Sequence, residues 1–370
     1  MRGIPVLFWL LSQVSFAQTI SQLKLLNIKE IPHHLAFNNT TVGGLSGIDY
    51  DPASNQYFLI CDDRSALQPA RYYTATITIN EKGIDTVKIT GVTTLRQPDG
   101  SAYPGAKENP ALTPDPESIR INHGSKLLVW SSEGERIVRN DKQVLTNPSL
   151  NTIDMQGKWI STFSLPAQLT MSQMEKGPRQ NGTLEGITFA DDYKTLYAAL
   201  EEPLYEDGPR ADLIDNNPWV RFYKFDVISG KNTAQYAYRL EKVAFPPTPS
   251  TAFMVNGIPD ILSINKHELL VIERSFSTGR LPCTVKLFIT DLSKAEDISI
   301  HQSLTQQPPA KPLNKKLLLN MDDLGVYVDN VEGATLGPVL PNGHRTLLLV
   351  TDDNFQAFEK TQFFLFEIIP

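Results

Sequence analysis

Hydrophobic and polar positions repeat along the chain in five units. Each unit opens with a short strand-like group, continues through a turn into an apolar strand, and ends in polar or acidic residues. The opening groups are 45–48, 116–119, 184–187, 259–262 and 331–334. Their second residues are 46, 117, 185, 260 and 332, and subtraction gives spacings of 71, 68, 75 and 72 residues. Self-similarity at a fixed spacing predicts a repeat architecture.

Most units continue with a third strand that is rich in aromatic and β-branched residues. These strands are expected at 71–77, 221–227, 285–289 and 363–368, and a fourth strand follows in several units, as at 237–240. Alternation with a period of two is typical of strands. Four strands in each unit predict the blade of a β-propeller. We therefore predict an all-β, five-bladed propeller with little helix; a six-bladed ring is the alternative if 140–174 holds an extra sheet.

The two ends of the chain are expected to meet in one blade. The last unit reaches only its third strand before Pro370, while an unassigned strand at 23–28 precedes the first unit. We predict that this N-terminal strand supplies the missing outer strand of the last blade. Closing the ring in this way removes sheet edges that would invite aggregation.

The first residues have the features of a secretory signal peptide. Met1 and Arg2 give a positive start, 6–11 are apolar, and Ser15 and Ala17 are small residues before a cut at Gln18. This pattern predicts a signal peptide at 1–17, with an N-terminal anchor as the alternative. The mature protein would be one propeller domain, 18–370, exported to the periplasm or the exterior. No later apolar run is long enough to span a membrane.

Composition and the absence of several motifs exclude some classes of function. The 370 residues are 41% hydrophobic and 20% charged, with a net charge of −7 that argues against nucleic-acid binding and suits cation binding. The two cysteines, Cys61 and Cys283, end or begin apolar runs and are expected to be buried thiols. We find no nucleophile elbow, P-loop or H-E-x-x-H motif, and the histidines have no ligand spacing, which disfavours zinc. We expect a monomer.

Acidic residues occupy equivalent places in the units. In a blade the first strand lines the channel and the second runs antiparallel beside it, so the start of the first and the end of the second share a face. We therefore predict that twelve carboxylates gather at one mouth of the channel: Glu117, Glu185, Asp260 and Glu332 from first strands, and Asp62, Asp63, Glu133, Glu201, Glu202, Glu273, Asp352 and Asp353 after second strands.

So many acids in one place must be protonated, paired or bound to cations. Calcium prefers carboxylate, carbonyl and water oxygens, so the predicted metal is calcium, held by some of these residues. Two alternatives stay open: the acids are solvated turn residues, or they bind a purely structural cation. Blade one has Ser46 where the others have an acid, which leaves an opening for a substrate.

Two arginines accompany the acids. Arg64 and Arg274 directly follow Asp63 and Glu273. An arginine fork binds phosphate oxygens in a bidentate manner, although these two residues would also serve simply to neutralise their acidic neighbours.

The ordered set of motifs resembles a known family. The motifs stand at 44–48, 62–64, 116–119, 184–187, 201–204, 273–274 and 331–334. Together they look like the phytase-like domain family, also described as esterase-like activity of phytase, from about Gly43 to the C-terminus. The resemblance implies an exported, acid-rich repeat domain for which phosphoester hydrolysis has been inferred. It is distinct from the calcium-dependent propeller phytases, whose motifs do not match this chain residue by residue.

These observations lead to a functional hypothesis and two alternatives. The protein would be an exported hydrolase of a small phosphoester, with calcium at the acidic mouth. Glu185 or Glu332 would be the general base, and Arg64 or Arg274 would hold the phosphate. The alternatives are a non-catalytic binding module with a structural cation, and a calcium-dependent lactonase or other ester hydrolase.

Overall fold

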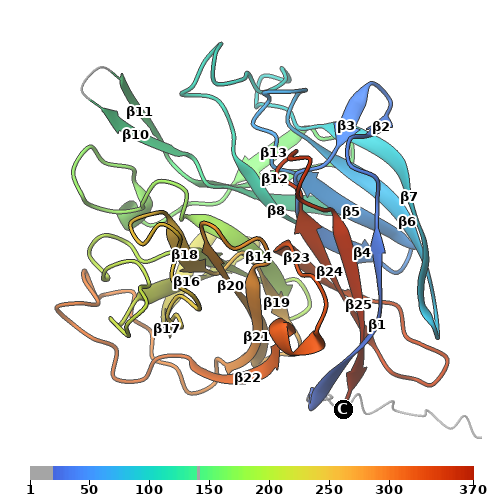
Figure 1. The fold of residues 1–370 in the computed structure, drawn as a ribbon. Helices are drawn as coiled ribbons and strands as arrows, with labels where there is room; N and C mark the ends of the chain where they lie inside the picture. Colours follow the sequence, from blue (N-terminus) through green and yellow to red (C-terminus); the bar gives the residue numbers. More distant parts are fainter. Residues whose placement is uncertain (1–19, 140–141) are drawn as a thin grey trace, which may run out of the picture.

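Five antiparallel sheets form the body of the protein, four of them with four strands and one, in blade four, with five. The computed structural model describes residues 20–139 and 142–370, so the predicted signal peptide at 1–17 lies outside the described residues. The sheets follow one another along the chain and are arranged as the blades of a propeller (Figure 1). The prediction of an all-β, five-bladed propeller is confirmed.

Each blade uses one strand at each of four levels, from the channel outward. The innermost strands are β4 (Leu45–Asp51), β8 (Pro116–Asn122), β14 (Leu184–Ala190), β19 (Ile261–Ser263) and β23 (Asn330–Gly337). The second strands are β5 (Gln56–Cys61), β9 (Leu127–Ser132), β15 (Thr195–Leu200), β20 (Glu268–Ser277) and β24 (Thr346–Asp352). The third strands are β6 (Arg71–Asn80), β12 (Ser149–Ile153), β16 (Trp219–Asp226), β21 (Thr284–Asp291) and β25 (Gln362–Ile369). The outer strands are β7 (Gly83–Thr94), β13 (Trp159–Thr162), β17 (Lys231–Arg239), β22 (Asn314–Asn320) and β1 (Gln22–Glu30).

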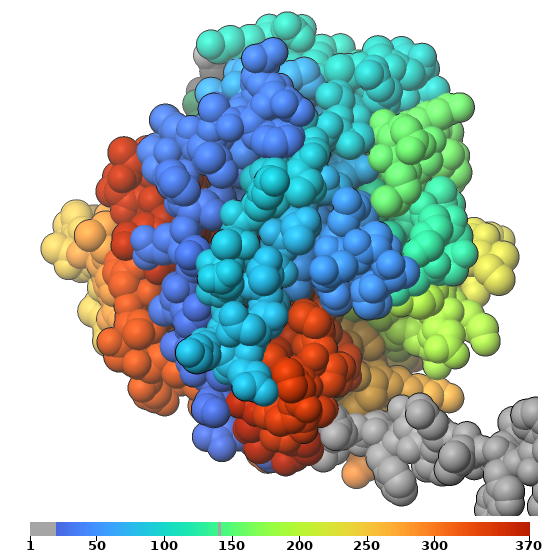
Figure 2. Space-filling view, turned by 90° about the vertical axis from the view of Figure 1, so that its right-hand side faces the viewer, coloured from blue at the N-terminus to red at the C-terminus, as the bar shows by residue number. Residues whose placement is uncertain are grey.

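The N-terminal strand completes the last blade, as predicted. β1 pairs antiparallel with β25 from Gln22 opposite Ile369 to Glu30 opposite Gln362. The blue start and red end of the described chain accordingly lie side by side (Figure 1), and Figure 2 shows the same two ends in contact on the surface. Backbone hydrogen bonds between the two ends of the chain thus close the ring.

Blade two contains an insertion instead of a sixth blade. The hairpin of β10 (Glu135–Arg139) and β11 (Lys142–Thr146) lies between β9 and β12 and projects from the body (Figure 1). The following strands, β12 and β13, complete the sheet of blade two. The described residues between 142 and 174 therefore add no further blade.

A few short elements complete the described chain. A hairpin of β2 (Leu35–Phe37) and β3 (Thr40–Val42) precedes blade one, and β18 (Met254–Gly257) pairs with the far end of β20. Two 3₁₀ helices, η1 (Ala167–Leu169) and η2 (Met321–Leu324), are the helical elements of the described residues. Neither has the length or apolar character needed to cross a lipid bilayer.

Apolar side chains between neighbouring blades form the core. Phe58 and Ile60 of blade one pack with Ile119 and Trp130 of blade two in one buried cluster. Truncation of a large side chain in such a cluster costs about 2–5 kcal/mol of stability. Both cysteines are buried free thiols, as predicted.

The innermost strands pack backbone to backbone around the channel. A Cβ atom on Gly186 would lie 2.6 Å from the Cα of Asp260, and one on Gly47 would lie 2.8 Å from the carbonyl oxygen of Glu117. Only glycine permits this approach. The short distance between blades brings side chains from different blades into contact at the mouths of the channel.

Candidate functional site

One mouth of the channel opens into an acidic cavity of about 730 Å³. Its lining combines residues that lie more than 300 positions apart in the sequence. The acidic side chains that line it are Asp62, Asp115, Glu117, Glu185, Glu201, Asp329, Glu332, Asp352 and Glu359. We call this space the acidic cavity.

Bulges in the innermost strands direct one set of acids into the cavity. In blade three, Leu184 pairs with Leu200 and Ile187 with Ala198, so two residues of β14 stand opposite one residue of β15. Equivalent register shifts occur in the inner strands of blades one, two and five. A β-bulge turns a side chain out of the regular alternation. Glu117, Glu185 and Glu332 occupy these bulges, and Ser46 occupies the one in blade one.

The ends of the second strands supply the remaining acids. Asp62, Glu201 and Asp352 lie at these ends and line the cavity. Glu133 follows β9 and is buried, and its carboxylate accepts a hydrogen bond from the backbone N–H of Thr183 at 2.6 Å. The shared-face argument from the sequence holds for these four residues.

Two triads of carboxylates overlap at Glu133. Oxygen atoms of Asp115, Glu117 and Glu133 lie within 4.8 Å of one another, and the same is true of Glu133, Glu185 and Glu201. Glu133, Glu185 and Glu201 are all buried. Each triad offers hard oxygen ligands at a spacing that suits a divalent cation such as calcium.

Burial and mutual repulsion raise the pKa values of these acids. Burial, followed by the nearby charge of Asp63, raises the pKa of Asp62 to about 7. Burial and Glu201 raise the pKa of Glu133 to about 8. The pKa values of Asp115, Glu117, Glu185 and Asp352 are raised well above the usual range, with burial as the main cause and neighbouring carboxylates adding to it. The cluster therefore carries its full charge at neutral pH only if positive charge is supplied to it.

Arg274 supplies part of that positive charge. Its guanidinium donates to Glu201 at 2.7 Å, to Glu332 at 2.8 Å and to the side chain of Asn330. Burial raises the pKa of Glu332 and Arg274 lowers it, with a net pKa of about 7. Arg274 thus links acids of blades three and five from its position in blade four.

Arg64, which follows the second strand of blade one, also lines the cavity. It donates to Glu135 at 2.5 Å and lies 3.4 Å from Asp115. The two arginines that the sequence singled out therefore both line the cavity, and both are paired with carboxylates.

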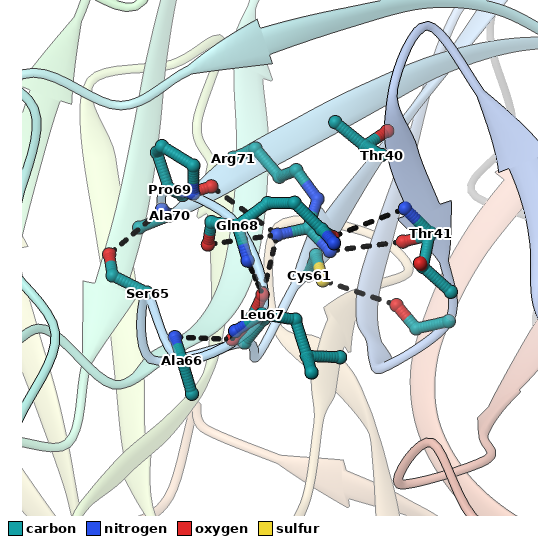
Figure 3. A network of polar contacts seen from close by, with 12 residues as sticks. Thr40, Thr41, Cys61, Ser65, Ala66, Leu67, Gln68, Pro69, Ala70 and Arg71 are labelled. Carbon is teal, nitrogen blue, oxygen red and sulfur yellow. Dashed lines mark hydrogen bonds and ion pairs between the residues drawn. The ribbon is translucent and has the colours of Figure 1, made fainter.

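Two predicted site residues organise loops outside the cavity lining. Asp63 accepts three backbone N–H groups of residues 66–68 and binds Arg71 at 2.7 Å. Figure 3 shows Arg71 enclosed by this loop and by Thr41. Asp353 accepts the backbone N–H groups of Gly44 and Phe355 and contacts His33 at 3.3 Å. Each follows an acid that faces the cavity, so the alternation of an extended chain turns it away.

Two further predicted residues are also outside the lining. Glu202 forms an ion pair with Arg210 at 2.9 Å. Glu273 is buried and accepts hydrogen bonds from Tyr238 at 2.7 Å and Lys315 at 2.6 Å. The carboxylate of Glu273 is thus occupied by partners within the protein. Both oxygens of Glu202 lack a hydrogen-bond donor among the described residues, and burial and the charge of Glu201 raise its pKa to about 8.

Asp260 is fully buried and lies outside the lining of the acidic cavity. The guanidinium of Arg120 in blade two contacts both of its oxygens, at 2.9 and 2.6 Å, and the backbone N–H of Ala334 in blade five donates to it at 2.8 Å. Burial raises the pKa of Asp260 to about 6 although Arg120 lowers it. This residue joins three blades across the channel.

The sequence analysis missed several residues of the cavity. Asp115 belongs to one triad and stands directly before the Pro116–Glu117 pair, a position that the repeat pattern left out. Asp329 and Glu359 come from loops around blade five. The apolar part of the lining, which includes Phe253, Phe276 and Phe358, also had no signal in the repeat, because it comes mainly from loop and strand residues that are particular to blade four.

The other mouth of the channel has a different lining. Its cavity of about 540 Å³ is formed by the opposite ends of the inner strands and includes Asp49, Arg120, His123 and Arg345. Asp49 is satisfied there by the backbone N–H of Ile121 at 2.8 Å and by Thr335 at 3.1 Å. No carboxylate triad was found at this mouth among the described residues.

Comparison with known proteins agrees with the motifs. A family model described as phytase-like, esterase-like activity of phytase, matches residues 40–355. A search of curated proteins finds no significant match to the chain.

A comparison with solved structures finds many chains of similar fold. They include an endo-arabinase from Bacteroides thetaiotaomicron, with 8% identity, a TM-score of 0.46, and coverage of 89% of this chain and 95% of that one. A periplasmic gluconolactonase from Pseudomonas aeruginosa has 10% identity and a TM-score of 0.36, with 87% and 84% covered. An exo-β-1,3-galactanase from Phanerochaete chrysosporium has 12% identity and a TM-score of 0.46, with 94% and 64% covered.

Proposed function

The chain belongs to the phytase-like family, and from that premise we propose that it is an exported hydrolase that cleaves phosphoesters with calcium held in the acidic cavity. The observation that carries the proposal is the pair of carboxylate triads that share Glu133. Two adjoining oxygen-rich sites beside a cavity are the arrangement expected of a cation-assisted phosphoester hydrolase.

The residues present suit calcium. The donors are all carboxylates, which are the ligands that hard cations prefer. One oxygen of Asp62 is buried without a hydrogen-bond partner among the described residues, and burial raises its pKa. Glu133, Glu185 and Glu201 would hold one cation, and Asp115 and Glu117 would join Glu133 to hold a second. Calcium bound there would neutralise phosphate charge and polarise the P–O bond.

Glu332 is the better of the two candidate bases. Its pKa of about 7 leaves it partly ionised at neutral pH, where a general base is most effective. Arg274 fixes its orientation through the 2.8 Å hydrogen bond. Glu332 would accept the proton of the attacking water, while Glu185, as a member of a triad, serves as a cation ligand instead.

The arginines would hold the phosphate group. Arg274 lines the cavity, and its side chain is partly exposed there. Its guanidinium would share its N–H groups between the carboxylates of Glu201 and Glu332 and an oxygen of the phosphate. Arg64 faces it from blade one and would stabilise the charge that develops on the leaving oxygen.

The test combines calcium binding with phosphate release. We expect calorimetry to detect calcium binding at micromolar to millimolar concentration, and p-nitrophenyl phosphate to be hydrolysed in a calcium-dependent way. Glu133→Gln should lose both, whereas Glu81→Gln, in the exposed turn between β6 and β7, should keep both.

Other outcomes would redirect the proposal. Absence of calcium binding would overturn the mechanism. Calcium binding with no turnover of any phosphoester or ester would favour the non-catalytic binding module. Release of a carboxylic acid from esters or lactones without phosphate release would favour the calcium-dependent ester hydrolase.

A further inference from the structure

The acidic cavity has one apolar wall. Six apolar or aromatic side chains line it on the side of blade four and the loops beside blade five: Phe253, Val255, Phe276, Leu281, Tyr327 and Phe358. We call these residues the apolar wall. The acids of the two triads come from blades two and three, so the triads and the apolar wall belong to different blades. The acids of blade five, Asp329, Glu332, Asp352 and Glu359, line the cavity beside the wall.

Much of the apolar wall is exposed to solvent. The exposed fractions are 56% for Phe253, 64% for Leu281 and 62% for Phe358. Large apolar side chains gathered at a cavity mark a binding surface more often than single exposed ones do. The wall has a firm base, because Phe276 packs on the buried core and its ring lies 6.2 Å from that of Phe253.

The charges of the cavity oppose a polyphosphorylated substrate. Nine acidic side chains line it against three arginines, Arg64, Arg274 and Arg280. Arg64 and Arg274 are paired with acids, and Arg280 lies 3.8 Å from Asp322 and stacks on the ring of Phe245 at 3.7 Å. One phosphate group is compatible with one or two bound cations. Additional phosphate groups would lie against carboxylates or phenyl rings and would have no positively charged partner.

From this division we propose that the substrate is a phosphomonoester of an apolar alcohol, with an aryl or branched alkyl group on the apolar wall. This proposal rests on the proposed function, which supplies the phosphate ester as the reacting group. It adds the chemical class of the alcohol. The cavity of about 730 Å³ is large enough for one phosphate and one ring system. Phe253 and Phe358 would then determine specificity by contact with the alcohol.

The test measures binding independently of turnover. Phenylphosphonate and methylphosphonate carry the same head group and differ only in the apolar part, and neither is hydrolysed. In the presence of calcium, calorimetry should show that phenylphosphonate binds on the order of tenfold more tightly. Phe253→Ser and Phe358→Ser should each reduce this preference to about threefold or less. Ile228→Ser removes a side chain that is 92% exposed in the turn between β16 and β17, and it should leave the preference unchanged.

Turnover gives the second measurement. The kcat/KM for 1-naphthyl phosphate should exceed that for glycerol 2-phosphate and for myo-inositol hexakisphosphate by about tenfold or more. Equal binding of the two phosphonates, or a preference for the hexakisphosphate, would overturn the proposal. A clear phenyl preference with no phosphate release from any ester would instead refute the hydrolase function and support the apolar binding site.

Discussion

Blade four differs from the other blades although it follows the same repeat. In blades two, three and five the acid in the inner bulge lines the cavity, but in blade four Asp260 turns into the channel and binds Arg120. At the end of the second strand, Glu201 and Asp352 face the cavity in blades three and five. In blade four Arg274 takes that place, and Glu273 faces away. An equivalent repeat position therefore does not give an equivalent role.

The length of the second strand explains why an arginine instead of an acid faces the cavity in blade four. β15 ends at Leu200, whereas β20 continues to Ser277 because β18 pairs with its far end from Gly257 opposite Arg274. A strand that continues keeps its side chains alternating between two faces. Glu273 thus faces Tyr238 and Lys315, and Arg274 faces the cavity. One extra stretch of pairing places a positive charge where the other blades place a negative one.

Removal of Asp260 should have the largest effect on stability. Asp260→Ala leaves Arg120 charged and buried without its ion-pair partner, so we expect a loss of about 3–5 kcal/mol in the free energy of unfolding. Chemical denaturation would measure this loss. The double variant Arg120→Met with Asp260→Leu removes both charges and should recover most of the stability. A loss of less than about 1 kcal/mol for Asp260→Ala would show that the pair does not connect the blades.

Removal of the acid at the corresponding position of blade three should raise the stability of the cation-free protein instead of lowering it. Glu185 stands at the equivalent position, and burial together with its carboxylate neighbours raises its pKa well above the usual range. Glu185→Gln should therefore stabilise the cation-free protein by about 1–2 kcal/mol at pH 8 while it weakens calcium binding at least tenfold. Denaturation in a chelator and calcium calorimetry would measure the two effects. If Glu185→Gln destabilised the protein in the chelator, the result would contradict the view that the Glu185 carboxylate destabilises the cation-free protein.

The pH dependence of the cation-free protein should follow the raised pKa values. Burial raises the pKa of Asp62 and of Glu332 to about 7 and that of Glu133 to about 8, all above the pKa values in an unfolded chain. The folded state therefore binds more protons than the unfolded state, so their stabilising contribution is complete below about pH 4 and is lost as the pH rises to about 8. In a chelator the melting temperature should fall by several degrees between pH 5 and pH 8.5. Calcium should remove or reverse this trend, and a flat profile in the chelator would contradict the charge repulsion.

The sequence predicted the fold more completely than the site for a physical reason. Strand periodicity and the repeat spacing are properties of the chain itself, so five blades and the closing strand at 23–28 could be inferred without coordinates. The direction of a side chain at a strand end depends on whether the strand stops there, which is set by pairing with other residues. The sequence could therefore place Glu201 and Glu273 in the same class but could not show that only Glu201 enters the cavity. Asp115 was missed because it stands one residue before the repeated group.

The smallest expected effect is the change in calcium affinity on substitution of Glu273, which is compared with substitution of Glu201. Glu273→Gln keeps one acceptor oxygen, for Tyr238, but replaces the oxygen that accepts from Asn256 by an amide donor. It also loses the ionic contribution of Lys315, which is mostly buried, so we expect a cost of about 1–2 kcal/mol in stability. Because Glu273 faces away from the cavity, the calcium affinity of this variant should stay within about twofold of the unmodified protein. Glu201→Gln removes a member of a triad and should lower that affinity at least tenfold. Equal losses in both variants would mean that the second strand of blade four contributes a ligand after all, and that the difference between the blades does not extend to cation binding.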